Sequence, residues 1–371
     1  MGAFHDKRVG LALSPHLFKY RDKESPTLYR PLVTLSGVLF AASLLALSAL
    51  TACGHATPIS SAAAPTATPV VPSVTAEFAI PTSSAGVTAL TIGGNSSIWF
   101  TEGSADKIGQ LETTGTVVDY PLPTANAMPD DLVAAPDGNL WFTEFNGNKI
   151  GKINISGTTI VEYTLPTPGS EPEGITLGSD GALWFTEAGT AKIGRITTSG
   201  TITEYAIPTA SADPTSIAAG SDGALWFTEY NAAKIGRITT SGTVTEYPVA
   251  AGSKPTSILN GADGALWFLE QGTNKIGRIL TNGTGLTERT LGVAVGSSPT
   301  IGAIAEGADS NFYFTDIPGN KIGQFLSNGG TVSEYAIPTA ASSPLAVAIG
   351  PDQRIYFSES AGNKIGQLSY F

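Results

Sequence analysis

Six carboxylate side chains gather in two short stretches of the chain, and each stretch holds three of them over 15 to 17 residues. Crowded carboxylates repel one another unless water or a hard cation lies between them. Two interpretations stay open: a Mg²⁺ or Ca²⁺ site, with Glu171, Glu187, Asp130 and Glu144 as its ligands, or a hydrated acidic rim without a metal. The six residues are Asp130, Asp131, Glu144, Glu171, Glu173 and Glu187.

The chain lacks the side chains that several common site chemistries need. Its three histidines are His5, His16 and His55, and Cys53 is its one cysteine. A Ser-His-Asp triad and a zinc site of the usual ligands are therefore excluded beyond residue 55. If this region is catalytic, Glu173 is the candidate base, although a carboxylate is a weak base unless its pKa is raised.

The acids belong to a unit that recurs seven times at spacings of 41 to 46 residues. In its clearest copy, Asp-Gly-Ala-Leu-Trp-Phe-Thr-Glu ends at Glu229 and Lys-Ile-Gly begins at Lys234. Because a feature of every copy is architectural, we expect most of these acids to pair with the lysine five residues on or with backbone N–H groups. The repeated acids are Glu102, Glu144, Glu187, Glu229, Glu270, Asp316 and Glu359.

Each unit predicts four short strands. In the third copy, runs rich in apolar, aromatic and β-branched residues cover 174–177, 183–187, 192–197 and 201–207. Glycine turns separate the runs, and Pro208 ends the last one because proline has no N–H to donate. Four antiparallel strands repeated seven times predict an all-β fold, a seven-bladed β-propeller.

The two ends of the chain predict how the ring closes. Six units are followed by a fourth strand of the Glu-Tyr type, but the seventh unit ends at Phe371 without one. The missing copy lies at the start, as Glu-Phe-Ala-Ile-Pro over 77–81. We therefore expect the N-terminal strand to complete the last blade, which removes two exposed sheet edges. The propeller is predicted to span residues 75–371.

Residues that break the repeat are the candidates for ligand contact. A proline starts most of the predicted innermost strands, and the residue after it should point toward the axis of the ring. Asp130 and Glu173 hold this position in blades two and three, where other blades have uncharged residues. The other residues expected to line the ligand funnel are Thr88, Asp131, Thr215, Thr256 and Thr300.

The first 53 residues predict a lipoprotein signal segment. Basic residues extend to Arg30, residues 31–50 carry no charge, and Leu-Thr-Ala-Cys ends at Cys53. This is the pattern of a bacterial lipobox, so we expect lipidation at Cys53; an uncleaved transmembrane helix is the alternative. Residues 54–74 are rich in Ala, Pro, Thr and Ser and predict a linker. The protein is expected to be exported and to touch the membrane through this anchor alone.

Charge limits the class of partner. Residues 1–52 contain six basic and three acidic residues, so the remainder has 14 basic and 28 acidic residues and a net charge of −14. This balance argues against nucleic acid and suits cationic or metal partners. We expect a monomer that binds a small molecule, a peptide or a glycan at the top face of the ring.

The repeat reads Asp-Gly-x-Leu-Trp-Phe-Thr-Glu-x4-Lys-Ile-Gly-Arg-Ile-Thr, followed by Glu-Tyr-x-Ile-Pro-Thr. Along all seven units this repeat resembles the virginiamycin B lyase (streptogramin lyase) family. The resemblance implies a seven-bladed propeller and a Mg²⁺-assisted elimination that opens the ester of type B streptogramins. The family's base is the histidine of a Glu-Pro-His-Gly-Ile motif, and its metal ligands are the Glu of that motif and the Glu of the following strand. A second histidine, at the matching position one blade earlier, holds the substrate.

This chain departs from the family's motif. Its last blade reads Ser-Pro-Leu at 343–345, and the nearest match is Glu-Pro-Glu-Gly-Ile at 171–175. The match implies Glu171 and Glu187 as metal ligands and places Glu173 where the base would be. Two hypotheses follow: a lipoprotein that binds a ligand without catalysis, which we favour, and a metal-dependent carbon–oxygen lyase or hydrolase with Glu173 as its base.

Overall fold

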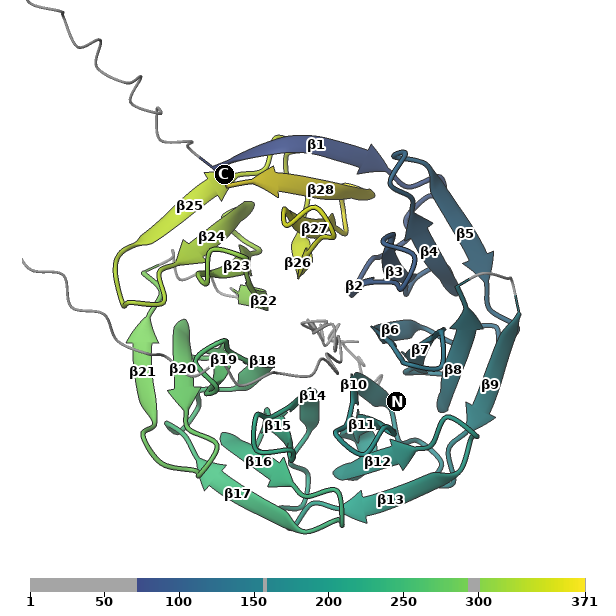
Figure 1. Cartoon of the computed structure of the whole chain (residues 1–371), viewed down its shortest axis with the longest axis vertical. Helices are drawn as coiled ribbons and strands as arrows, with labels where there is room; N and C mark the ends of the chain where they lie inside the picture. The colour runs from purple at the N-terminus through teal and green to yellow at the C-terminus, as the bar shows by residue number, and fades with distance from the viewer. Residues whose placement is uncertain (1–71, 156–158, 293–300, 371) are drawn as a thin grey trace, which may run out of the picture. The chain divides into compact units, whose positions relative to one another are not determined.

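A computed structural model describes residues 72–155, 159–292 and 301–370. These residues form seven four-stranded antiparallel sheets arranged as blades around a ring (Figure 1). One short 3₁₀ helix, η1 (Ala188–Thr190), interrupts the strands. No helix among the described residues is long and apolar enough to span a bilayer. The predicted all-β, seven-bladed propeller is confirmed.

In blades 1 to 6 the first strand of the blade lies innermost and the fourth lies outermost; in blade 7, β26 lies innermost and β1 outermost. Blade 1 has β2 (Leu90–Ile92), β3 (Ile98–Glu102), β4 (Lys107–Leu111) and β5 (Val117–Pro121); blade 2 has β6 (Pro129–Ala134), β7 (Asn139–Glu144), β8 (Lys149–Asn154) and β9 (Ile160–Thr164). Blade 3 has β10 (Pro172–Leu177), β11 (Leu183–Glu187), β12 (Lys192–Ile196) and β13 (Ile202–Ala206); blade 4 has β14 (Pro214–Ala219), β15 (Leu225–Glu229), β16 (Lys234–Ile238) and β17 (Val244–Pro248). Blade 5 has β18 (Pro255–Asn260), β19 (Leu266–Glu270), β20 (Lys275–Ile279) and β21 (Thr287–Thr290). Blade 6 has β22 (Ile301–Glu306), β23 (Phe312–Asp316), β24 (Lys321–Phe325) and β25 (Val332–Ala336); blade 7 has β26 (Pro344–Ile349), β27 (Ile355–Glu359), β28 (Lys364–Ser369) and β1 (Ser73–Ala79).

The repeated motif follows from the packing inside a blade. The phenylalanine of Trp-Phe lies under the glycine of Lys-Ile-Gly on the next strand, as with Phe142 and Gly151. A Cβ atom at Gly151 would lie only 2.2 Å from the Phe142 ring, so only glycine fits there. The same contact recurs in the other blades, which explains why the two motifs occur together. These phenylalanines are fully buried and form the centre of each blade.

A second set of contacts joins the turn, the tryptophan and the outer strand. In blade 3 the indole N–H of Trp184 donates to Asp180 at 3.1 Å, and the Arg195 Nε donates to the same carboxylate at 2.7 Å. Trp184 stacks on Tyr205 with ring centroids 5.5 Å apart, and the Arg195 guanidinium lies 5.7 Å from the Trp184 centroid. The Asp-Gly turn therefore orients the aromatic and cationic side chains as well as reversing the chain.

Hydroxyl groups connect neighbouring blades. Thr143 Oγ1 accepts a hydrogen bond from the Asp131 amide at 3.0 Å and donates to the Glu173 carbonyl of the next blade at 2.6 Å. Thr101 and Thr186 make equivalent bridges from blades 1 and 3. These bridges fix the backbone of the innermost strands, where the candidate residues lie.

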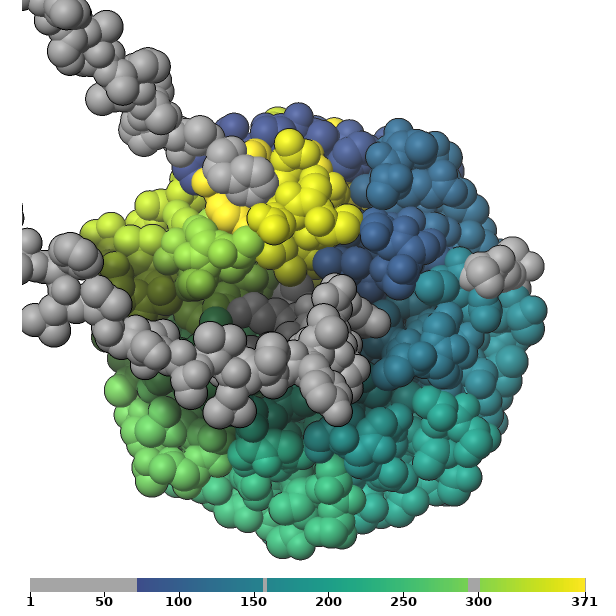
Figure 2. Space-filling view, in the orientation of Figure 1, coloured from purple at the N-terminus to yellow at the C-terminus, as the bar shows by residue number. Residues whose placement is uncertain are grey.

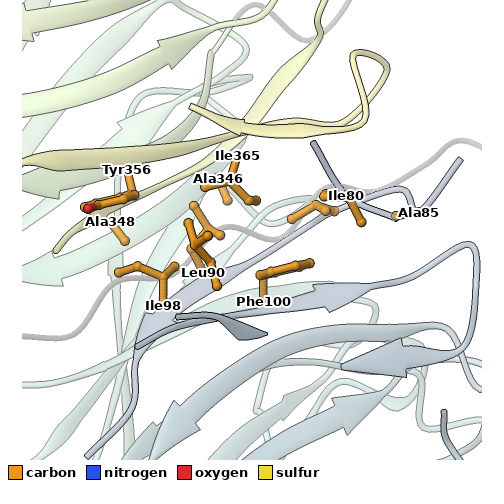
Figure 3. Close-up of a cluster of buried hydrophobic side chains, with 11 residues drawn as sticks. Ile80, Ala85, Leu90, Ile98, Phe100, Ala346, Ala348, Tyr356 and Ile365 are labelled. Atoms are coloured by element: carbon orange, nitrogen blue, oxygen red, sulfur yellow. The ribbon is translucent and has the colours of Figure 1, made fainter. Parts of the chain in front are cut away.

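The ring closes as the sequence predicts. Strand β1 pairs with β28 in an antiparallel register that runs from Ser73 to Ala79, two residues earlier than the predicted start of the propeller. Glu77 accepts hydrogen bonds from Lys364 at 2.9 Å and from Thr339 at 3.0 Å. Apolar side chains of blades 7 and 1 pack together between the two blades (Figure 3). In the space-filling view the yellow C-terminal residues lie against the dark blue residues at the start of the described chain (Figure 2).

Candidate functional site

The innermost strands carry the candidate residues at one edge of the ring. We call this the top edge, because the strands begin there with Pro129 in β6 and Pro172 in β10. The register of each strand shifts just after its proline, between Pro129 and Leu132 and between Pro172 and Ile175. Such bulges re-aim side chains at the end of a strand. At this point the residues after the prolines depart from the regular strand pattern, in which successive side chains point to opposite faces of the sheet.

Asp130 and Glu173 hold equivalent positions on the adjacent blades 2 and 3, and both are almost fully buried, with 1% and 2% of their surface exposed. Their backbones are fixed by the preceding blade, since the Asp130 carbonyl accepts from Thr88 at 2.8 Å and the Glu173 carbonyl accepts from Thr143. Both carboxylate oxygens of Asp130, and Oε2 of Glu173, have no hydrogen-bond partner. We call these two residues the carboxyl pair.

The two members of the pair influence each other's ionisation. Burial raises the pKa of Asp130 to about 8, and the nearby Thr88 hydroxyl opposes the shift only in part. Burial also raises the pKa of Glu173 well above its usual value, and the charges of Asp130, Asp213 and Glu171 raise it further. A carboxyl with a pKa near 8 is mostly protonated at neutral pH. The pair therefore holds at least one proton unless a cation takes its place.

Asp213 joins this group although the sequence analysis did not select it. Burial raises its pKa, as does the charge of Glu171, and its carboxylate accepts from Asn231 at 2.9 Å. Asp213 and Glu171 both precede the proline of an innermost strand, and both have a positive φ, 55° and 49°. The signal that would have identified Asp213 is thus its position before Pro214, one blade after Glu171.

Asp131 has a structural role in blade contact. Its Oδ1 accepts from the Leu132 amide and its Oδ2 from the Ile175 amide of the next blade, both at 2.8 Å. Ser216 and Ser257 occupy the same position in blades 4 and 5 and accept from the next blade in the same way. Asp131 was predicted to line the funnel, but its oxygens are aimed at these amides.

The lysines of the repeat pair with outer-strand acids, while Asp316 shows the other predicted arrangement and accepts from the Gly319 amide at 3.0 Å. Lys149 donates to Glu162 of the outer strand at 2.7 Å, and Glu144, five residues before it, has no hydrogen-bond partner for either oxygen. The reason is that Glu162 also accepts from the Thr124 amide and hydroxyl, at 3.0 and 2.6 Å, so its negative charge is better stabilised. Although burial opposes it, these bonds hold the pKa of Glu162 below its ordinary value. Burial and the Glu162 charge raise the pKa of Glu144 to about 8.

The predicted metal ligands lie in different surroundings. Glu171 is exposed, whereas Glu187 is fully buried and accepts from Ser170 at 2.7 Å and Thr190 at 3.2 Å. Glu144 lies inside blade 2, with its carboxylate against Gly147. Among residues 72–155, 159–292 and 301–370, no three His, Cys, Asp or Glu side chains are arranged to hold a metal ion. The residues present therefore do not complete a hard-cation site, and metal binding stays a prediction.

The remaining candidates divide into two groups. Thr88, Thr215 and Thr256 lie at the top edge and are 4% to 7% exposed. Thr88 and Thr215 also share a hydrogen bond with the threonine of the neighbouring strand, at 2.7 and 2.9 Å. Thr300 and Cys53 lie outside the described residues.

The site can hold a proton or a cationic group, and it can act as a base only after it loses its proton. Burial and nearby carboxylates raise the pKa of Glu173, which makes its carboxylate a stronger base than an ordinary one once the proton has left. The described residues contain no histidine, since all three histidines precede residue 56. The arrangement is therefore suited to cation binding more than to proton abstraction at neutral pH.

Comparison with known proteins identifies close relatives. The sequence matches the model of the virginiamycin B lyase family over residues 70–249 and 205–370. The fold is similar to that of virginiamycin B lyase from Staphylococcus aureus, with 39% identity and a TM-score of 0.74 over 80% of this chain and 99% of that one. It is also similar to a streptogramin B lyase, with 38% identity and a TM-score of 0.74 over 79% of this chain and 96% of that one. A third similar structure is a catalytically inactive histidine-to-alanine variant of the S. aureus enzyme with quinupristin, with 39% identity and a TM-score of 0.74 over 80% of this chain and 99% of that one. No curated protein matches the chain.

Proposed function

Since this chain belongs to the virginiamycin B lyase family, we propose that it uses the family's propeller to bind a ligand, and that the carboxyl pair binds a cationic group of that ligand. The observation that carries the proposal is the burial of Asp130 and Glu173 with three oxygens unpartnered. A buried carboxylate without a partner is costly, and a cation that enters the site would offset that cost. The ligand is then a small molecule or peptide with an ammonium or guanidinium group.

The proposal predicts a specific loss of binding. Purified full-length protein should melt at a higher temperature with benzylamine or agmatine, and benzyl alcohol should have little effect because it carries no charge. Asp130→Asn and Glu173→Gln should each remove the stabilisation. Glu102→Gln is the matched control, because Glu102 is also buried with both oxygens unpartnered but lies inside blade 1. Equal shifts in all variants, or equal shifts with the alcohol, would disprove cation binding at the pair.

A second candidate function is a lyase or hydrolase with Glu173 as its base. The observation that favours it is the raised pKa of Glu173, at the position that the family's catalytic histidine holds in its motif. A related structure of a catalytically inactive histidine-to-alanine variant argues in the other direction, since this chain has no histidine beyond residue 55. The binding function is therefore the better supported of the two.

The two functions differ in a direct assay. We expect the purified protein, with Mg²⁺ present, to leave a type B streptogramin intact over hours, because no imidazole is available to take the proton. Mass spectrometry of the antibiotic measures the linear product, and the S. aureus enzyme serves as the positive control. Rapid Mg²⁺-dependent linearisation that Glu173→Gln abolishes would assign the chain to the lyases instead.

The anchor is proposed from the sequence alone. Cys53 follows an uncharged, mostly apolar segment and precedes a linker rich in Ala, Pro, Thr and Ser. We expect the mature protein to begin at a lipid-modified Cys53 and to partition with membranes. Cys53→Ser should leave an unlipidated precursor that keeps residues 1–52. Mass spectrometry of wild-type protein that finds an intact N-terminus and an unmodified Cys53 would favour an uncleaved transmembrane helix.

A further inference from the structure

The contact between blades 7 and 1 departs from the other blade contacts at the bottom edge of the ring, opposite the top edge. In blades 2, 3 and 4 the outer-strand tyrosine fills this contact and lies against a glycine of the next blade's turn. A Cβ atom at Gly200, Gly242 or Gly283 would lie within 2.0 to 2.3 Å of that ring. The tyrosines also stack on tryptophans, with centroids 5.4 to 5.6 Å apart.

Three substitutions reduce the volume of side chain at this contact. The residue in the tryptophan's place is Tyr356, the one in the tyrosine's place is Phe78, and Gln367 stands where blades 2 to 5 have lysine or arginine. A Cβ atom at Gly115 would lie 3.3 Å from the Phe78 ring, about 1 Å farther than in blades 2 to 4. At the contact between blades 6 and 7, Tyr370 packs on Tyr313 with centroids 5.0 Å apart and occupies the equivalent place.

A cavity of about 280 Å³ lies at the contact between blades 7 and 1. We call it the seam cavity. Its volume is close to the lower end of the range of roughly 300–1,000 Å³ for small-molecule sites. One part of its lining is apolar and comes from Phe78, Ile98, Leu111 and Tyr356. Tyr356 and Ile98 belong to the apolar cluster drawn in Figure 3.

The other part of the lining is polar and includes a donor without a partner. Arg354 donates from Nη1 to Asp352 at 3.0 Å, but its Nε is buried and has no hydrogen-bond partner. The equivalent residue in blades 3 to 5 is alanine, so this arginine is an addition to the repeat. Glu112, Thr113 and Thr114 also belong to the polar part, together with Ser96 and Gln367. A buried unpartnered N–H favours a ligand that brings an acceptor oxygen.

The charges of the lining residues limit the chemical class of the ligand further. The lining has two carboxylates, Glu112 and Asp352, and one guanidinium, so it disfavours anions. A neutral ligand is needed that has an apolar face for Phe78 and Tyr356, an acceptor for Arg354 Nε, and hydroxyl donors for the carboxylates. We propose that the seam cavity binds a single neutral sugar ring, as a free monosaccharide or as one unit of a glycan.

The chain itself supplies the variants that test this site. Tyr356→Trp combined with Phe78→Tyr restores the residues found in blades 2 to 4 and should fill the cavity without unfolding the ring. Arg354→Ala restores the alanine of blades 3 to 5 and removes the unpartnered donor. Arg237→Ala is the matched control, because it removes an arginine of the bottom edge in blade 4, away from the seam cavity.

Saturation-transfer NMR on full-length protein in detergent measures binding of methyl glucoside and of methyl N-acetylglucosaminide, with phenol and benzoate as non-sugar probes. We expect at least one of the sugars to bind at millimolar concentration, the filled variant to lose that signal, and Arg354→Ala to weaken binding about tenfold. Arg237→Ala should bind as wild type does. Absence of sugar binding, a filled variant that still binds the sugar, or binding of phenol or benzoate alone would each overturn the proposal.

Discussion

Deletion of residues 77–81 is expected to lower the free energy of unfolding by several kcal/mol, out of a total of roughly 5–15 kcal/mol for a typical domain. The deletion removes Glu77, Phe78 and Ala79, which are half of the β1 residues paired with β28. It also removes the contacts of Glu77 with Lys364 and Thr339, and the packing of Phe78 and Ile80 on the cluster in Figure 3. The edge of blade 7 would then be open to solvent or to another chain.

Urea denaturation followed by far-UV circular dichroism measures this effect on the full chain. Deletion of five residues of the predicted linker, 60–64, is the control and should leave the midpoint unchanged. A smaller test uses Glu77→Gln, which keeps the strand but removes the charge opposite Lys364. If the strand deletion unfolds at the same urea concentration as wild type, β1 does not close the ring.

The melting temperature is expected to fall as the pH rises from 5.5 to 9. Burial raises the pKa of several repeated acids, and in most blades the outer-strand acid beside them raises it further. The pKa is raised to about 8 for Glu102, Glu144 and Glu229. It is raised to about 7 for Glu187 and Glu359.

The direction of this pH dependence follows from whether the folded or the unfolded state binds protons more tightly. A carboxyl whose pKa is raised in the folded protein contributes stability that is complete below its unfolded value of 4.5 and is lost as the pH rises through 7 to 8. The outer acids act in the opposite direction. Hydrogen bonds from lysines hold their pKa below the ordinary value although burial opposes this, as for Glu162 and Glu204, so their contribution is lost only as the pH falls below about 4.5. Stability should therefore be greatest in weak acid.

If each raised carboxyl contributes on the order of 1 kcal/mol, the melting temperature should fall by about 10 °C between pH 5.5 and 9. Differential scanning calorimetry across this range measures the change. Glu229→Gln should flatten the curve, since glutamine stays neutral at every pH. A melting temperature that is constant or higher at pH 9 would show that these acids ionise normally in the folded protein.

The sequence was sufficient for the fold because each strand carries its own local signal. The Trp-Phe pair and the Lys-Ile-Gly motif depend on each other through one close contact, so their joint recurrence counts the blades. The position of the closing strand followed from one missing copy of the outer strand. Predicted strand ends differ by one or two residues, as for β10, which begins at Pro172 because the bulge lets the proline pair opposite Glu187.

The site was less predictable because pairing across blades depends on geometry that spacing does not record. The lysine at 149 was expected to pair with Glu144, five residues before it, yet its partner Glu162 lies 13 residues after it and also binds the loop from the preceding blade. Asp131 was expected in the funnel, but the bulge turns it toward the Ile175 amide. The position after the proline was inferred from strand topology, and there Asp130 and Glu173 do lie close enough to influence each other's charge.

The most direct test of the central claim is to count the protons released when a cation binds to the carboxyl pair. Benzylamine is titrated into the full-length protein by calorimetry at pH 7, in two buffers with different ionisation enthalpies. We expect binding to release about one proton per ligand and to tighten as the pH rises, because the ammonium replaces a proton that Asp130 and Glu173 hold. Binding without proton release, or binding that Asp130→Asn and Glu173→Gln leave unchanged, would contradict the claim.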